Sequence, residues 1–320
     1  MGTNCSASPK TIDCLYNIAS HAGLVPDASL DASLASLLSL NSSSVLEQQY
    51  STLQSGMTRQ QRIAFNQDLN TLFGGNTTVS YGGVGVVALA LSILFEMLAH
   101  HQTTGLGSRS PEARSQPPDP IHRIFGADAG SDISSIASEF LKQVPGTAND
   151  QDKMVALLES YERRLRTELM DFYARMVSLE RITLSSAGVK QWINGAALHI
   201  HTFLHWNRLT NPSAGERLSL DYLHRVDPLL KAYKEYLLKT VKVLPALSPG
   251  PSGLLIVEPL KNVSHEVRHR ICERRAIQRA LVENFLSAQN LQRGKEFFQS
   301  SHKHHEALMA QQGHFLLSMA

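Results

Sequence analysis

The sequence predicts an all-α protein, in which a bundle of long helices surrounds a central apolar helix and is joined to a helical amino-terminal region. Apolar residues recur at steps of three and four over long stretches, as they do on one face of an α-helix. Helix-capping patterns precede several of these stretches. Only one run, residues 254–257, has the composition of a strand, and a single strand cannot form a sheet.

The amino-terminal region, residues 1–101, contains three expected helices before its apolar segment. Ser8 and Pro9 mark the start of the first helix, which Gly23 ends. Asp27 is the expected N-cap of the second, whose apolar face carries Leu30, Leu34, Leu37 and Leu38. Thr58 and Gln61 form a capping box that opens a third helix, and Gly74 and Gly75 follow its end.

The apolar segment, residues 79–95 (VSYGGVGVVALALSILF), carries no charge. A membrane-spanning helix needs ~20 apolar residues and at least ~17, so this segment lies at the threshold between a core helix and a membrane segment. Its small residues permit close backbone approach in a bundle or in a bilayer. The candidate membrane-insertion residues are Gly82, Gly83, Gly85, Val86, Leu89, Ile93 and Phe95.

A linker is expected at residues 102–120, which are rich in Gly, Pro, Ser and Gln, and a helical bundle domain at residues 121–320. In this domain we first predict three helices. The first covers about 132–144 and is stopped by Pro145, the second begins after its N-cap Asp150, and the third covers 189–209. A capping box of Ser213 and Glu216 opens a further helix that Pro228 kinks and that ends near Pro245. Ser264 is the expected cap of a terminal helical region.

The composition excludes several classes of function. A net charge of +2 with 18% charged residues gives no global signature of a nucleic-acid partner. Three cysteines are too few for a disulfide scaffold or a Cys-rich zinc module, and no cofactor is expected. The first ten residues, MGTNCSASPK, lack the apolar core of a secretory signal, so we expect a cytoplasmic chain rather than a secreted one.

The same residues match the pattern for N-myristoylation, with Gly2 as the acceptor and Ser6 at the required position. Cys5 lies where a second acyl chain can be attached. One myristoyl chain binds membranes only marginally, with a constant of ~10⁴ M⁻¹, so a second attachment matters. The alternative is a coincidental match, because Ser and Thr are abundant in this chain.

Two further patterns have a chemical interpretation. His265, Glu266 and His269 match the H-E-x-x-H motif of zinc hydrolases, but Arg268 and Arg270 would place cations beside the metal, and no clear third ligand follows. His201 and His205 form a second pair with helical spacing, which we assign to core packing because no carboxylate or thiol shares their face. No catalytic residue is assigned, and the chain is expected not to be an enzyme.

A run of basic residues, RHRICERRAIQR, offers a candidate surface for lipid contact through Arg268, Arg270, Arg274, Arg275 and Arg279. Each basic residue near an anionic bilayer contributes ~1 kcal/mol. The alternative is a solvated helix face whose arginines pair with acids on neighbouring helices.

Three stretches resemble uncharacterised fish proteins that are labelled cephalotoxin-like, a name taken from a secreted salivary toxin of cuttlefish. They are GGVGVVALALSILF, IFGADAGSDISSIASEFLKQ and KQWINGAALHIHTFLH, so the resemblance covers roughly residues 60–240. It implies a helical, non-enzymatic protein that acts on membranes.

The sequence therefore favours a non-enzymatic, membrane-associated helical protein, lipid-anchored and able to insert its apolar segment after rearrangement. Membrane lipid, a protein partner and a second copy are the partners considered. The alternative is a soluble helical interaction module in which the apolar segment is a core helix, because protein and lipid interiors select the same residues. Zinc-dependent hydrolysis is the third interpretation.

Overall fold

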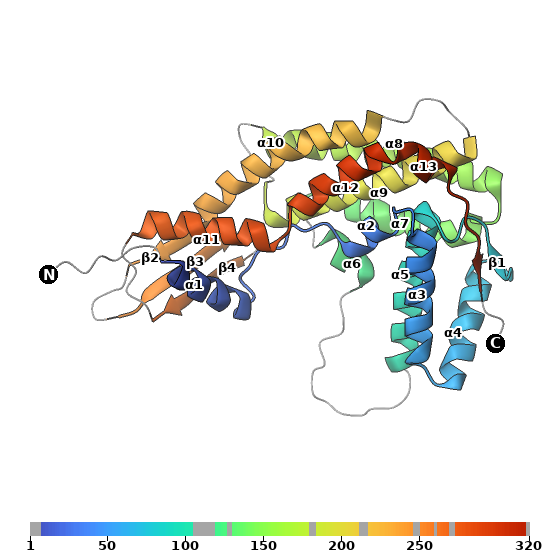
Figure 1. The fold of residues 1–320 in the computed structure, drawn as a ribbon, viewed down its shortest axis with the longest axis horizontal. Helices are drawn as coiled ribbons and strands as arrows, with labels where there is room; N and C mark the ends of the chain where they lie inside the picture. Colours follow the sequence, from blue (N-terminus) through green and yellow to red (C-terminus); the bar gives the residue numbers. More distant parts are fainter. Residues whose placement is uncertain are drawn as a thin grey trace.

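The computed structural model describes residues 8–104, 119–126, 130–178, 184–210, 217–245, 250–258, 261–268 and 273–317. It confirms the predicted fold class: the structure is 73% helical and its sheets are small. Long helices form the body of the molecule, α3 and α4 project from one end together with α5, and a small sheet covered by α1 and α11 forms the other end (Figure 1).

Helix α5 (Gly85–Thr104) forms the centre of one half of the core. It packs against α3 (Ser42–Ser55), α4 (Arg59–Leu72), α7 (Ile133–Thr147) and α9 (Ser186–Thr210). All seven candidate insertion residues in and before this helix are buried. Among the residues that the structure describes, no helix is long and apolar enough to cross a membrane.

The second half of the core lies between α7, α8 (Gln151–Val177) and α9. Helix α9, predicted at 189–209, is buried on most of its circumference. Gly195 allows α9 to approach its neighbours closely, and the indole of Trp192 donates a hydrogen bond to the carbonyl of Leu169 on α8, at 3.0 Å. Helices α10 (Arg217–Thr240) and α12 (Gln292–Lys303) pack along the same body.

Local capping follows the sequence closely. Ser8 caps α1 (Pro9–His21), Thr58 and Gln61 form the predicted capping box of α4, and Asp150 caps α8. Two predictions are wrong in detail. Asp31, not Asp27, caps α2 (Ala32–Ser36), and α7 continues through Pro145 to Thr147. The capping box at Ser213 and Glu216 lies outside the described residues.

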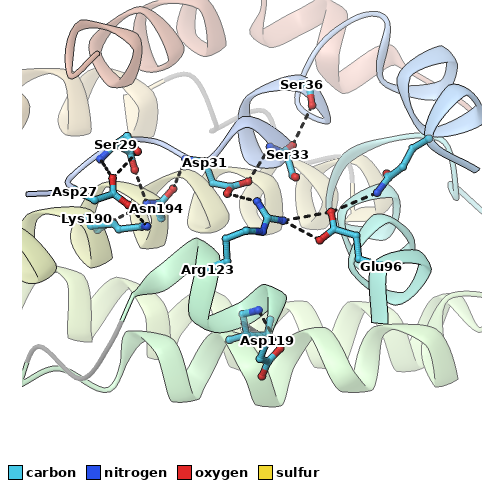
Figure 2. A network of polar contacts seen from close by, with 12 residues as sticks. Asp27, Ser29, Asp31, Ser33, Ser36, Glu96, Asp119, Arg123, Lys190 and Asn194 are labelled. Atoms are coloured by element: carbon cyan, nitrogen blue, oxygen red, sulfur yellow. Dashed lines mark hydrogen bonds and ion pairs between the residues drawn. The ribbon is translucent and has the colours of Figure 1, made fainter. Parts of the chain in front are cut away.

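Asp31 also belongs to a polar network that fastens residues 27–31 to the body (Figure 2). Arg123, from α6 (Pro120–Phe125), donates to Asp31 at 2.5 Å and to Glu96 of α5 at 3.0 Å. Lys190 of α9 pairs with Asp27, and the Asn194 side chain accepts from the Asp31 amide at 2.8 Å. The network joins three helices to one extended segment.

A three-stranded antiparallel sheet corrects the expectation that no sheet forms. Its strands are β2 (Val241–Leu244), β3 (Ser252–Glu258) and β4 (Lys261–Val267), in the order β2-β3-β4. The predicted strand-like run forms most of β3, and it finds partners on both sides. Helix α10 therefore ends at Thr240 rather than near Pro245, and Ser264 lies in β4 instead of capping a helix.

The remaining described elements belong to the carboxyl-terminal part of the chain. Helix α11 (Arg274–Ala288) packs against β2 and α1. After α13 (His305–Ala310), β5 (Phe315–Leu316) pairs antiparallel with β1 (Thr78–Val79), so the carboxyl-terminal segment lies beside the entrance of α5.

Candidate functional site

The H-E-x-x-H pattern does not have the geometry that a zinc site requires. His265 and Glu266 are neighbours on β4, where they face Leu254 and Gly253 of β3. Successive side chains of a strand point to opposite faces of the sheet, so the two cannot act as a helical ligand and base at one site. His269 lies outside the described residues. Within the described ranges, no three His, Cys, Asp or Glu side chains are grouped closely enough to hold a metal ion.

His201 and His205 are core residues of α9. The His201 ring donates from Nε2 to the carbonyl of Leu34 at 2.8 Å, and His205 accepts from Arg208 at 2.9 Å. Burial lowers the pKa of His201 to about 4 and that of His205 to about 3, so both rings are neutral at neutral pH. This agrees with their assignment to core packing.

The basic run is only partly helical, but part of it forms a defined site. Arg274, Arg275 and Arg279 line one side of a cleft of about 950 Å³, and Lys242 lines the other side. Arg268 follows the end of β4 and does not line this cleft, and Arg270 lies outside the described residues. We refer to the cleft formed by Lys242, Arg274, Arg275 and Arg279 as the basic cleft.

Two local patterns place these cations. In β2, Val241 and Val243 are buried and Lys242 and Leu244 are exposed, as expected of a strand with one covered face. In α11 the buried side chains are Ile277, Leu281, Val282 and Phe285, and the three arginines are exposed. The burial of apolar side chains on each element thus leaves its cations at the surface.

Gln278 fixes the two sides of the cleft relative to each other. Its side-chain nitrogen donates to the carbonyl of Leu238 at 2.7 Å and to that of Val241 at 2.5 Å. Leu238 lies in the last turn of α10, and Val241 is the first residue of β2, directly before Lys242. Gln278 therefore ties the start of β2 to the helix that carries the arginines.

Among the described residues, acids do not balance the charges of the basic cleft. Glu273 is the only acid that lines it, and no described carboxylate forms an ion pair with any of its four cations. The acid one turn beyond Arg279 is Glu283, and it pairs with Lys234 of α10 instead. Arg275 and Arg279 are themselves one turn apart, a like-charge spacing that costs ~0.2–0.5 kcal/mol in a helix.

Sequence reasoning missed Lys242, because residues 241–244 were included in the preceding helix. The alternation of valine with exposed residues in VKVL was the available signal of a strand. Gly2 and Cys5, the predicted lipidation residues, lie outside the described residues.

No protein-family model, curated protein or solved structure matches the chain. The resemblance to cephalotoxin-like proteins therefore stays a prediction, and functional inference rests on the geometry of the basic cleft.

Proposed function

We propose that this is a non-enzymatic helical protein that associates with the surface of anionic membranes through its basic cleft. The observation that carries the proposal is the convergence of Lys242, Arg274, Arg275 and Arg279 on one exposed cleft, where none of them is ion-paired with an acid in the part of the chain that the structure describes. Exposed cations that lack protein partners are available to anionic groups outside the protein.

The amino terminus supports the same orientation. Helix α1 packs against α11 and β4 (Figure 1). The ring centroids of Tyr16 and Phe285 lie 6.1 Å apart. Gly2 lies seven positions before Pro9, the first residue of α1, and a chain of that length reaches at most about 25 Å. An acyl chain on Gly2 would therefore be attached close to the part of the molecule that carries the basic cleft.

The expected binding free energies explain why both the basic cleft and the acyl chain are needed for membrane attachment. Four cations at ~1 kcal/mol each supply ~4 kcal/mol, which corresponds to a dissociation constant of about 1 mM. A myristoyl chain alone binds with ~10⁴ M⁻¹. Acting together on one face, the two bring the affinity into the micromolar range or below, and neither does so alone.

The test compares the full chain, N-myristoylated at Gly2, on vesicles with and without phosphatidylserine at two salt concentrations. We expect binding that requires the anionic lipid and weakens with salt. The variant Arg274→Ala/Arg275→Ala/Arg279→Ala should lose about 100-fold in partitioning, from ~1 kcal/mol per cation. If wild-type protein at low salt binds equally to vesicles with and without phosphatidylserine, the proposal is refuted.

A matched control removes the same charge elsewhere. Arg59, Arg62 and Lys142 are exposed cations on α4 and α7, and none of them lines the basic cleft. Their replacement by alanine should leave the partitioning within twofold of wild type. An equal loss in both triple variants would mean that net charge, not the cleft, governs binding.

A second candidate function is a helical interaction module, and the burial of α5 favours it. Residues 86–91 are at most 1% exposed, so the most apolar part of the chain is already covered by protein. This candidate predicts monodisperse protein that stays in the supernatant with all the vesicles above.

A further inference from the structure

The shape and charge of the basic cleft specify its ligand more narrowly than an anionic surface does. Resting on the proposed function, we infer that the basic cleft binds a headgroup that carries two or more clustered phosphomonoesters. A surface of singly charged headgroups would then be a poorer partner at the same total charge.

The first reason is shape. The cleft is an open depression of about 950 Å³ between β2 and the start of α11, and small-molecule sites reach a similar volume. A phosphorylated ring can lie in a depression of this size and contact side chains from both elements. Separate headgroups each meet only one or two of these cations at a time.

The second reason is charge. The four cations and the single acid Glu273 give the described lining of the cleft a net charge of +3. A phosphomonoester carries about −1.5 to −2 at neutral pH, so two of them supply ~−3 to −4. A single phosphodiester or carboxylate neutralises only about a third of the cleft.

The third reason is the type of cation. Three of the four are arginines, whose planar guanidinium groups bind phosphate oxygens in a bidentate manner. The Cβ atoms of Arg275 and Arg279, one helical turn apart, are separated by about 5–6 Å. Each can therefore engage a different phosphate of one headgroup, while Lys242 approaches from β2.

Gln278 has a positioning role in this site. Its amide is already bound to the carbonyls of Leu238 and Val241, so it holds Lys242 opposite the arginines rather than contacting the ligand. Gln278→Ala should therefore weaken the preference for clustered phosphates, with little effect on binding to phosphatidylserine, to which the side chains bind as separate charges.

The experiment compares two vesicle compositions of equal surface charge, one containing phosphatidylserine and the other a bisphosphorylated inositol lipid. Full-length myristoylated protein should bind the second at least tenfold more tightly. Arg275→Lys/Arg279→Lys retains the charge but loses the guanidinium forks, and we expect it to lose most of this preference while still binding phosphatidylserine. The Arg59→Ala/Arg62→Ala/Lys142→Ala variant should keep the preference, and circular dichroism and thermal unfolding check that each variant is folded.

Soluble probes distinguish the source of the phosphates. Inositol trisphosphate should compete with the bisphosphorylated vesicles. If calorimetry shows that inositol trisphosphate binds the protein but the protein binds no vesicles, the phosphate chemistry is supported and the membrane function is refuted. Equal binding to both vesicle compositions refutes the inference and leaves the proposed function standing. Displacement by an acidic peptide of equal charge, without displacement by inositol trisphosphate, also refutes the inference.

Discussion

Replacing Gly195 by alanine tests whether the close approach of α9 to its neighbours is required for stability. A Cβ atom at this position would lie 2.6 Å from Cγ2 of Ile133 on α7 and 3.1 Å from Cδ2 of Leu169 on α8. Both neighbours are fully buried. The added methyl group therefore has no free space, and one or more helices must shift.

The expected magnitude is the difference between two opposing effects. Alanine is favoured over glycine in a helix interior by roughly 0.8–1 kcal/mol. Overpacking a filled core costs typically ~1–3 kcal/mol. Because the first contact is far inside van der Waals distance and involves a buried branched side chain, we expect the larger cost and a net loss of about 1–2 kcal/mol.

Urea unfolding of wild type, Gly195→Ala and Gly294→Ala provides the assay. Gly294, in the first turn of α12, is the matched control, because its Cβ would meet only Cγ2 of Ile193, at an ordinary 3.5 Å. Gly294→Ala should be neutral or stabilising. If Gly195→Ala is also neutral or stabilising, the close packing of α7, α8 and α9 at this glycine is incorrect.

Two further predictions concern buried polar groups. Arg123→Ala leaves the Asp31 carboxylate, whose side chain is 8% exposed, without its cation, and should cost about 1–3 kcal/mol by chemical denaturation. Arg163→Ala, which breaks a pair whose arginine is 74% exposed, should change stability by no more than ~0.5 kcal/mol; equal losses would argue against the network in Figure 2. His201 has a folded-state pKa of about 4 against 6.5 when unfolded, because burial disfavours its charged form. The unfolded state therefore binds the extra proton first, so the contribution of His201 to stability, present above pH 6.5, should fall by about 3 kcal/mol between pH 6.5 and 4. His205, whose pKa is about 3, adds a loss of its own over the same range. His201→Gln should therefore reduce the slope without abolishing it, measured by urea unfolding across that range, and an unchanged slope would contradict the assignment.

Local sequence patterns were sufficient for much of the fold. The capping box of Thr58 and Gln61 and the N-cap Asp150 involve contacts only three residues apart, so they can be read without tertiary structure. The apolar spacing of α8 likewise identified its buried face, since that face must be covered by some partner.

The site was predictable only in part. The charge run pointed to Arg274, Arg275 and Arg279, because charged side chains of a helix lie on its solvent face. Lys242, which lines the opposite side of the cleft, could not be found from the charge run. Its place depends on the pairing of β2 with β3, which brings together residues distant in the sequence and is not specified by neighbouring residues.

The sequence by itself thus determined the helical class, the starts of α1, α4, α7 and α8, and the existence of one central apolar segment. Tertiary structure alone decided that 261–267 is a strand although it matches a helical motif, because hydrogen bonding to β3 outweighs local preference. It also decided that protein surrounds α5, since the apolar sequence satisfies a protein core and a bilayer equally well and only the surrounding helices distinguish the two.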